Sequence, residues 1–324
     1  MIDVLGGGWR HMKALIVQGY GQSASIGEID MPNVKDGYLL VRLQAAAVNP
    51  FDYKLISGMV KDLMPITFPY VPGMDGAGVV LEVGAGADEW NKGDAVLGMF
   101  ATGTLAQYAL ISAADTRLAR KPDDLDFERA AAVPEAGLTA TTILRAANVR
   151  DGQDVLIIGA TGGVGLFATQ LAKAQGARVI ATGKSEDADY LQRLGVTDVI
   201  DYASVDLTTQ MRKRYPSGVD VVIDLINTGD ALIRDAEVMR KGGTLVSSLF
   251  GPDKSAYPND ITVHYIQLQA KKGDLESLAR RAASGELQVE IGRTYDFVEG
   301  AQALADLRDP AKHTRGKLIV RAAP

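Results

Sequence analysis

A glycine-rich run in the middle of the chain follows a short apolar segment and precedes an amphipathic one. Residues 155–158 are four consecutive apolar side chains, three of them β-branched, which is typical of a buried parallel strand. Ala160, Gly162 and Gly165 stand at the three positions of a G-x-G-x-x-G pattern, with alanine in place of the first glycine. Residues 166–175 have helical apolar spacing and end before a glycine. This order of strand, turn and helix predicts the first unit of a dinucleotide-binding βαβ motif.

The turn has the properties that a pyrophosphate group needs. Gly162 and Gly163 let the backbone approach the phosphates closely, and the following helix begins with unpaired N–H groups at its positive dipole end. Gly165 would allow the helix to pack tightly on the strand. The turn residues that we expect to contact the cofactor are Thr161, Gly162, Gly163 and Val164.

The end of the next predicted strand indicates which dinucleotide binds. NAD enzymes carry an acidic residue there, which binds the ribose hydroxyls. This chain has Gly183, Lys184 and Ser185 instead, and a cation beside a hydroxyl suits a 2′-phosphate. Glu186 and Asp187 follow, where the first turn of a helix favours acidic side chains, and Ser185 would cap that helix. We therefore expect NADPH in preference to NADH.

Length, charge and cysteine content exclude several classes of protein. A chain of 324 residues predicts two domains. The net charge of −6 and the lack of a basic run with interleaved aromatics argue against nucleic acid, and no apolar stretch is long enough to span a membrane. Cysteine is absent, which excludes disulfides and cysteine-ligated zinc and fits a cytoplasmic protein. We expect residues 1–11 to be an added leader, with the native chain starting at Met12.

The chain divides into two parts with different secondary-structure patterns. From Met12 to about Pro122, short strands broken by Gly, Pro, Asn and Asp predict a compact barrel-like domain. Beyond Phe127, strands alternate with helices, which predicts a doubly wound parallel sheet. The predicted strands are 13–18, 39–45, 78–83, 95–99, 155–158, 178–182, 198–201, 219–224, 244–248, 261–269, 295–298 and 316–321. The predicted helices are 128–133, 137–147, 166–175, 187–194, 207–214, 231–240, 274–284 and 299–307.

Five local sequences resemble the medium-chain dehydrogenase/reductase superfamily, in its order and spacing. They are residues 45–54, 72–78, 137–140, 159–165 and 313–317, and the resemblance covers nearly the whole chain from Met12. It implies a chaperonin-10-like β domain, formed by residues 12–132 together with 270–324, joined to a Rossmann domain of residues 133–269. The active site would lie in the cleft between them. The resemblance also places Thr139, Tyr202 and Arg315 near the cofactor, although Tyr202 could equally be a core residue and Arg315 part of a solvated turn.

The residues that stand at the zinc positions of this superfamily indicate a branch. Asn49 and Met74 match the cysteine and histidine that bind the catalytic metal in the alcohol dehydrogenases, and neither an amide nor a thioether makes a competent zinc site. Asp75 lies near a metal-ligating acid of the family, but hydrogen bonding to the local turn explains it better. The chain is thus similar to the zinc-independent quinone oxidoreductase branch, which includes ζ-crystallin.

Without a Lewis acid, a conjugated acceptor is the easier substrate, because charge delocalises onto its oxygen and needs only hydrogen-bond donors. We therefore expect hydride transfer to a quinone or an activated α,β-unsaturated carbonyl. By the resemblance, Asn49 and Tyr53 are the candidates for orienting the substrate oxygen. The alternative roles are a turn cap before Pro50 for Asn49 and a core aromatic for Tyr53, and Lys54 is either a proton relay or an exposed lysine.

Two rival functions stay open. The first is reduction of an enoyl-CoA or another enoyl thioester, although Val60 stands where such reductases carry a tyrosine proton donor. The second is a protein that binds NADPH with little turnover, as a sensor or structural component. Residues 61–70 would line the substrate entrance. We expect a small-molecule substrate and, as in other members of the family, a homodimer.

Overall fold

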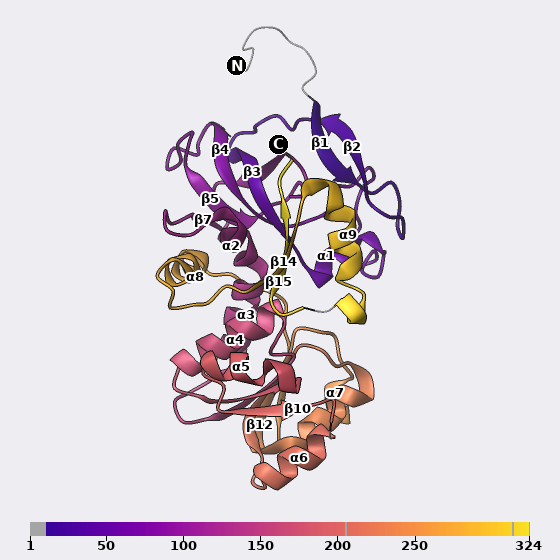
Figure 1. Cartoon of the computed structure of the whole chain (residues 1–324), viewed down its shortest axis with the longest axis vertical. Helices are drawn as coiled ribbons and strands as arrows, with labels where there is room; N and C mark the ends of the chain where they lie inside the picture. Colours follow the sequence, from indigo (N-terminus) through magenta and orange to yellow (C-terminus); the bar gives the residue numbers. More distant parts are fainter. Residues whose placement is uncertain (1–10, 205, 313, 324) are drawn as a thin grey trace.

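The computed structural model describes residues 11–204, 206–312 and 314–323. The predicted leader lies outside these residues except for His11, and so does His313 of the closing motif. The molecule has a β-rich upper half that contains the first and last described strands, and a lower half built on a parallel sheet (Figure 1). The predicted combination of a β-rich domain and a doubly wound domain is confirmed.

The β-rich half is organised around one long central strand, β3. Six strands form a sheet in the order β14-β15-β3-β4-β5-β7, and β6 also pairs with β3. A separate antiparallel pair, β1 and β2, lies beside it. The strands are β1 His11–Ile16, β2 Ser25–Asp30, β3 Tyr38–Val48, β4 Asp75–Val83, β5 Ala95–Met99, β6 Tyr108–Ser112, β7 Leu118–Arg120, β14 Ile291–Tyr295 and β15 Lys317–Arg321. The helices of this half are α1 Pro50–Ile56, α2 Phe127–Ala132 and α9 Gly300–Asp306.

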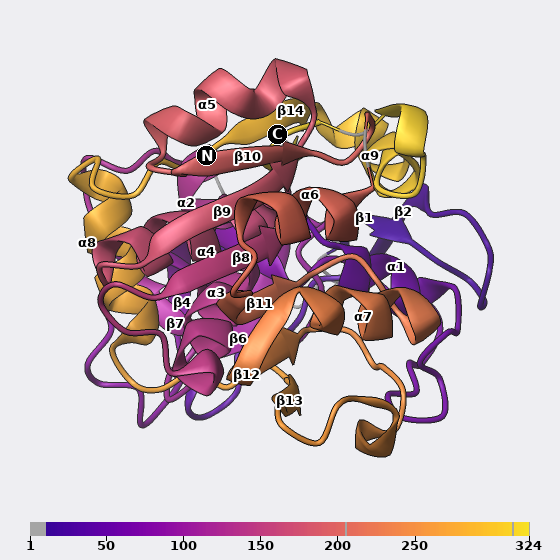
Figure 2. The same ribbon diagram turned by 90° about the horizontal axis from the view of Figure 1, so that it is seen from below.

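The lower half is a six-stranded parallel sheet in the order β10-β9-β8-β11-β12-β13 (Figure 2). Its strands are β8 Asp154–Ile158, β9 Arg178–Gly183, β10 Asp198–Asp201, β11 Val219–Asp224, β12 Met239–Ser247 and β13 Thr262–Tyr265. Its helices are α3 Pro134–Ala147, α4 Gly163–Ala174, α5 Ala188–Arg193, α6 Leu207–Arg214 and α7 Gly229–Asp235, and α8 Asp274–Ala283 packs on α3.

Side chains alternate across this sheet, as the pleat requires. Val155 and Ile157 of β8 pack on the side of α3 and α4, whereas Leu156 and Ile158 pack on the side of α6 and α7. Both faces of the strand are therefore buried, which explains why its sequence is continuously apolar and not alternating.

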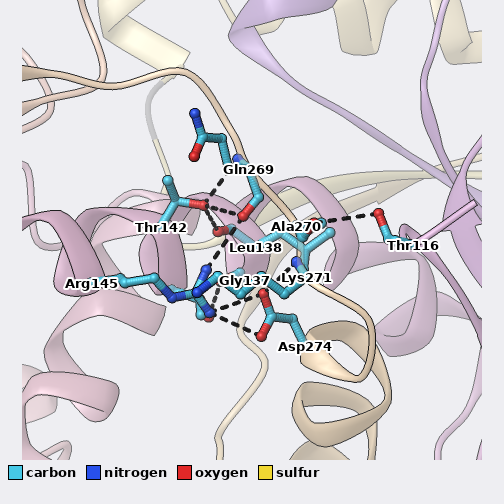
Figure 3. A network of polar contacts seen from close by, with 10 residues as sticks. Thr116, Gly137, Leu138, Thr142, Arg145, Gln269, Ala270, Lys271 and Asp274 are labelled. Atoms are coloured by element: carbon cyan, nitrogen blue, oxygen red, sulfur yellow. Dashed lines mark hydrogen bonds and ion pairs between the residues drawn. The ribbon is translucent and has the colours of Figure 1, made fainter.

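The last strand of the chain returns to the first half. β15 pairs antiparallel with β3 and parallel with β14, and in Figure 1 it lies among the much earlier strands of the upper sheet. The crossing back from the parallel sheet is anchored on α3 (Figure 3). Arg145 donates to both carboxylate oxygens of Asp274 at 3.0 and 3.1 Å, and Thr142 Oγ1 accepts from the backbone N–H of Gln269 at 3.2 Å.

Some predicted element boundaries are wrong. The helix predicted at 231–240 ends at Asp235, and Met239 already belongs to β12, because pairing with Val219 of β11 prevails over local helical spacing. The strand predicted at 295–298 lies at 291–295, where it pairs with β15. The elements that sequence patterns missed are β2, β6, β7 and α1.

Candidate active site

The glycine turn connects β8 to α4 as predicted, and Gly165 is the residue whose size matters most. A Cβ at Gly165 would lie 2.2 Å from the carbonyl oxygen of Gly159, so a larger residue would force the helix off the strand. Gly162 differs, because a Cβ there would meet only that same oxygen, at an ordinary 3.6 Å. The space at Gly162, in front of the N-terminus of α4, is open and fits a pyrophosphate group.

The closing segment of the chain contacts this turn directly. The backbone N–H of Gly316 donates to the carbonyl oxygen of Thr161 at 3.0 Å, and Gly162 and Gly316 form a parallel bridge. The stem of Lys317 lies against Gly163, since a Cβ on Gly163 would be 2.7 Å from Lys317 Cδ. The cofactor turn of one half of the molecule thus meets the last strand of the other half.

A buried polar cluster lies at this junction. Lys317 Nζ donates to the side-chain oxygen of Asn49 and to the backbone oxygen of Val48, the latter at 3.3 Å, and lies 3.6 Å from Asp75 Oδ2. Asn49 Nδ2 donates to Asp75 Oδ2 at 2.9 Å. Asp75 Oδ1 accepts from the backbone N–H of Glu135 at 3.0 Å. Asn49, Asp75 and Lys317 are 3%, 0% and 5% exposed, so the cluster is enclosed by protein.

Three carboxyl groups share this one ammonium group. Burial raises the pKa of Asp52 to about 7, against the opposing hydrogen bond from the backbone N–H of Asn49. Burial also raises the pKa of Asp75, which the charge of Lys317 opposes, and the pKa of Glu135 is raised well above its usual value by burial and then by Asp75 and Asp52. Asp52 Oδ1 and Glu135 Oε2 are enclosed without a hydrogen-bond partner among the described residues. Burial thus raises the pKa of all three carboxyl groups, and the charge of Lys317 opposes this rise at each of them.

Tyr53 and Lys54 belong to the same helix, α1, as Pro50. The ring of Tyr53 is partly buried and lies beneath the guanidinium of Arg308, 4.1 Å from the ring centre. Lys54 is half-buried. Among the side-chain hydrogen bonds of the described residues, none links Tyr53 to Asn49, Asp75 or Lys317. The two side chains predicted to orient the substrate oxygen therefore have different partners. Segment 61–70, predicted to line the substrate entrance, is largely exposed.

The end of β9 presents the residues predicted to select NADPH. Lys184 and Ser185 are exposed, and Lys184 Nζ lies 3.8 Å from Glu186 Oε1. The hydroxyl of Ser185 donates to Asp201, which ends the neighbouring strand β10. The prediction that Ser185 caps a helix is wrong, because Ser185 lies inside a short 3-10 turn and α5 begins only at Ala188. Tyr202 is 53% exposed and is not a core residue.

Arg315 forms an ion pair with Asp187, the last residue of the 3-10 turn that follows β9. Its guanidinium lies 3.2 Å from Asp187 Oδ1, 3.9 Å from Glu290 Oε1 and 4.4 Å from the ring centre of Tyr190. The carboxylate of Asp187 is thus paired with a cation of the closing segment. Arg315 links the closing segment to the same turn that carries Lys184.

A cavity of about 240 Å³ opens at the carboxyl ends of β12 and β13. This is the edge at which open parallel sheets bind their ligands. The residues that line the cavity are Ser248, Leu249, Phe250, Tyr265, Ile266, Gln267 and Gln269. Sequence patterns assigned none of these residues to a site. Thr139 of α3, which the resemblance placed near the cofactor, is buried, with 9% of its surface exposed.

Comparison with known proteins decides the family. One family model, described as an alcohol dehydrogenase GroES-like domain, matches residues 35–123, and another, described as a zinc-binding dehydrogenase, matches residues 163–271. A chloroplast envelope quinone oxidoreductase homolog of Arabidopsis thaliana is 30% identical over 95% of this chain and 98% of its own length. The chain belongs to the quinone oxidoreductase branch of the medium-chain dehydrogenase/reductase superfamily.

Two further relatives agree with this assignment. The structure of a quinone oxidoreductase from Coxiella burnetii superposes with a TM-score of 0.86 at 30% identity, covering 97% of this chain and 100% of that one. An NADPH-dependent alkenal/one oxidoreductase of Arabidopsis thaliana is 30% identical over 97% of this chain and 81% of the relative. The protein is therefore an oxidoreductase of a superfamily that uses nicotinamide cofactors.

The residues of this oxidoreductase do not fit the zinc ion that one family model's description mentions. Both ends of the Asn49 amide are bound, to Asp75 and Lys317, and the ammonium of Lys317 provides the positive charge that faces Asp75. The described residues contain no group of three or more His, Cys, Asp or Glu side chains that could hold a metal. No helix within the described ranges is both long and apolar enough to cross a membrane.

A second buried carboxyl pair holds the loop that touches the glycine turn. Asp224, at the end of β11, accepts from the backbone N–H groups of Ile226 and Asn227, each at 2.8 Å. The side chain of Ile226 covers Gly159, since a Cβ there would lie 2.7 Å from Ile226 Cγ1. Burial raises the pKa of Asp235 to about 8, and its hydrogen bond with Asp224 raises it as well. The amide nitrogen of Asn227 donates to both carboxyl groups, to Asp224 Oδ2 at 3.2 Å and to Asp235 Oδ2 at 2.8 Å.

Asp235→Asn should stabilise this oxidoreductase at alkaline pH. Since the folded pKa lies above the unfolded value, the wild-type protein loses stability as the pH rises toward about 8. Asparagine keeps a donor toward Asp224 without this loss. At pH 8 we expect a Tm roughly 2–4 °C above wild type, the shift that about 1 kcal/mol produces, and the difference should close toward pH 5. Thermal unfolding followed by circular dichroism would measure it, and a constant difference at every pH would refute the raised pKa of Asp235.

Proposed function

We propose that this protein transfers hydride from NADPH to a quinone or an activated α,β-unsaturated carbonyl, without a metal ion. The observation that carries the proposal is the enclosed cluster of Asn49, Asp75 and Lys317, in which an ammonium group faces the buried carboxyl group of Asp75. Such a site offers hydrogen-bond donors but no Lewis acid, which favours acceptors that delocalise charge onto oxygen by themselves. Similarity to quinone and alkenal/one oxidoreductases supports the same acceptor classes.

The chain's own residues would bind and orient the reactants. Gly162 would let the backbone approach the pyrophosphate closely, and the N–H of Gly163 at the start of α4 would bind it, whereas the N–H of Gly162 donates to Gly159 O at 3.2 Å. Lys184 and Ser185 would contact the 2′-phosphate. Thr139, Thr161, Val164, Gly183, Tyr202 and Arg315 complete the proposed cofactor site. Bound NADPH supplies the hydride. Asn49 and Tyr53 would hold the substrate oxygen, and one proton from solvent completes the reduction of a quinone to a hydroquinone or of an enone to a saturated carbonyl.

A panel of acceptors tests this function. NADPH absorbance is followed with 1,4-benzoquinone, 9,10-phenanthrenequinone, a simple enone and crotonyl-CoA. We expect oxidation of NADPH with the quinones or the enone. Turnover of crotonyl-CoA alone would favour an enoyl-thioester reductase instead. NADPH binding without oxidation above background by any acceptor would favour a sensor or structural protein.

Cofactor preference should respond in opposite directions to two substitutions at the end of β9. Lys184→Ala removes the cation proposed for the 2′-phosphate, and we expect the NADPH-to-NADH affinity ratio to fall by about fivefold, the worth of an exposed charge pair. Asp201→Asn removes a carboxylate beside Ser185, so the ratio should rise by a similar factor. Dissociation constants for both cofactors at low and high salt would measure this. An unchanged ratio in Lys184→Ala would refute the assignment.

We also propose the two-domain division at residues 12–132 with 270–324 and at residues 133–269. The anchoring of Gln269 and Asp274 on α3 supports a junction at this point of the chain. A homodimer and a cytoplasmic location stay predictions.

A further inference from the structure

Lys317 is a buried lysine at the head of an apolar strand. It is 5% exposed, and the three residues that follow it in β15, 318–320, are apolar and buried. Lysine is almost never enclosed in this way unless its charge is paired. Here the pairing partners, Asp75 and Asn49, come from the other end of the chain, and the proposed function gives Lys317 no role.

The chemistry of its partners determines how the Asn49 amide lies. An ammonium group can only donate hydrogen bonds, so the amide must turn its oxygen toward Lys317. An ionised carboxylate can only accept, so the amide must turn its nitrogen toward Asp75. When Lys317 and Asp75 are both in place, the Asn49 amide has only one allowed orientation. This orientation also fixes the direction of its second N–H.

Loss of the ammonium would remove this constraint. Burial favours the protonated form of Asp75, and the charge of Lys317 is the largest influence that opposes it. A protonated Asp75 could donate to the amide oxygen, which is the reverse of the present arrangement. The orientation of Asn49 therefore depends on Lys317 and not on Asp75 alone.

The same side chain also contacts the cofactor turn. The stem of Lys317 packs on Gly163, and the preceding Gly316 bonds to Thr161. One residue therefore contacts both the proposed pyrophosphate site and the proposed substrate-orienting amide. We propose that Lys317 is a positioning residue, which fixes the amide of Asn49 and seats it against the glycine turn. This inference rests on the proposed function, because it assigns Asn49 a role in that reaction.

A double-mutant cycle tests the proposal. We expect Asn49→Ala and Lys317→Met each to lower kcat by about a hundredfold, as misplacement of a reacting group by about 1 Å does. In the double variant kcat should fall no further than in the worse single variant, because Lys317 acts through Asn49. Losses that multiply in the double variant would overturn the proposal.

Two further variants separate positioning from folding. Lys317→Met leaves Asp75 without its cation and lowers the Tm, whereas Lys317→Met combined with Asp75→Asn removes both members of this ion pair and should recover much of the Tm. We expect kcat to stay low in this neutral pair. Recovery of kcat together with the Tm would show a structural role and overturn the proposal. Lys213→Met, at an exposed lysine of α6, is the matched control and should match wild type.

The readouts distinguish this proposal from the proposed function. If the wild-type protein reduces none of the acceptors, the proposed function fails, and the cycle is then measured in the NADPH dissociation constant. Lys317→Met and Asn49→Ala should again be non-additive there, because both alter the same junction. Additive effects on NADPH binding would overturn the positioning role in that case too.

Discussion

Replacing Gly162 with threonine is expected to leave the protein folded and to weaken NADPH binding by about a hundredfold, or roughly 2.7 kcal/mol. The backbone at Gly162 has φ −74° and ψ 166°, which any residue can adopt. A Cβ there meets no closer atom than Gly159 O at 3.6 Å. Threonine is also a good residue to precede a helix, so α4 should keep its start. The new side chain would fill the proposed pyrophosphate site and occupy its N–H groups.

Gly165→Ala provides the contrast. Its Cβ would lie 2.2 Å from Gly159 O, so this smaller change should lower the Tm markedly. Isothermal titration with NADPH and thermal unfolding of both variants would measure the two effects. If Gly162→Thr binds NADPH as tightly as wild type while folded, the pyrophosphate does not lie at this turn.

An enone should be reduced far faster than its saturated analogue. Because the site offers hydrogen bonds but no Lewis acid, an isolated ketone must develop its alkoxide charge with little stabilisation. We expect kcat/KM for cyclohexenone to exceed that for cyclohexanone by roughly a hundredfold to a thousandfold, the loss that one missing oxyanion donor causes. Steady-state NADPH oxidation measures the ratio. Treatment with a chelator should leave both rates unchanged, and comparable rates for the two substrates would contradict the proposal.

The glycine turn can be predicted from local sequence alone. The buried strand, the glycines and the following helix are neighbours in the chain, and each follows from its own residues. The sequence also predicts that Gly165 lets the helix pack tightly on the strand, and the close approach to Gly159 O confirms it. The open space at Gly162 is a consequence of the same short turn.

The buried cluster could not be predicted in the same way. Asn49 and Asp75 are 26 residues apart, and Asn49 and Lys317 are 268 apart. Lys317 was part of a recognised closing motif, but nothing in its neighbours shows that its ammonium is enclosed. The sequence feature that could have indicated the cluster is a lysine at the first position of an apolar strand, because a buried lysine needs a partner for its charge.

Tertiary pairing also explains the misplaced helix end. Residues 231–240 have helical spacing, yet Met239 joins β12 because a neighbouring strand offers it backbone hydrogen bonds. At Ser185, too, a tertiary contact prevails over the local sequence signal. It has the type and position of a helix cap, but Asp201 on the adjacent strand provides a competing partner for its hydroxyl.

The most direct test is the rate of NADPH oxidation with 9,10-phenanthrenequinone, measured on protein whose metal content is determined in the same sample. We expect turnover with far less than one zinc ion per chain, and no change after chelation. Absence of oxidation above background, or a rate that rises in proportion to bound zinc, would contradict it.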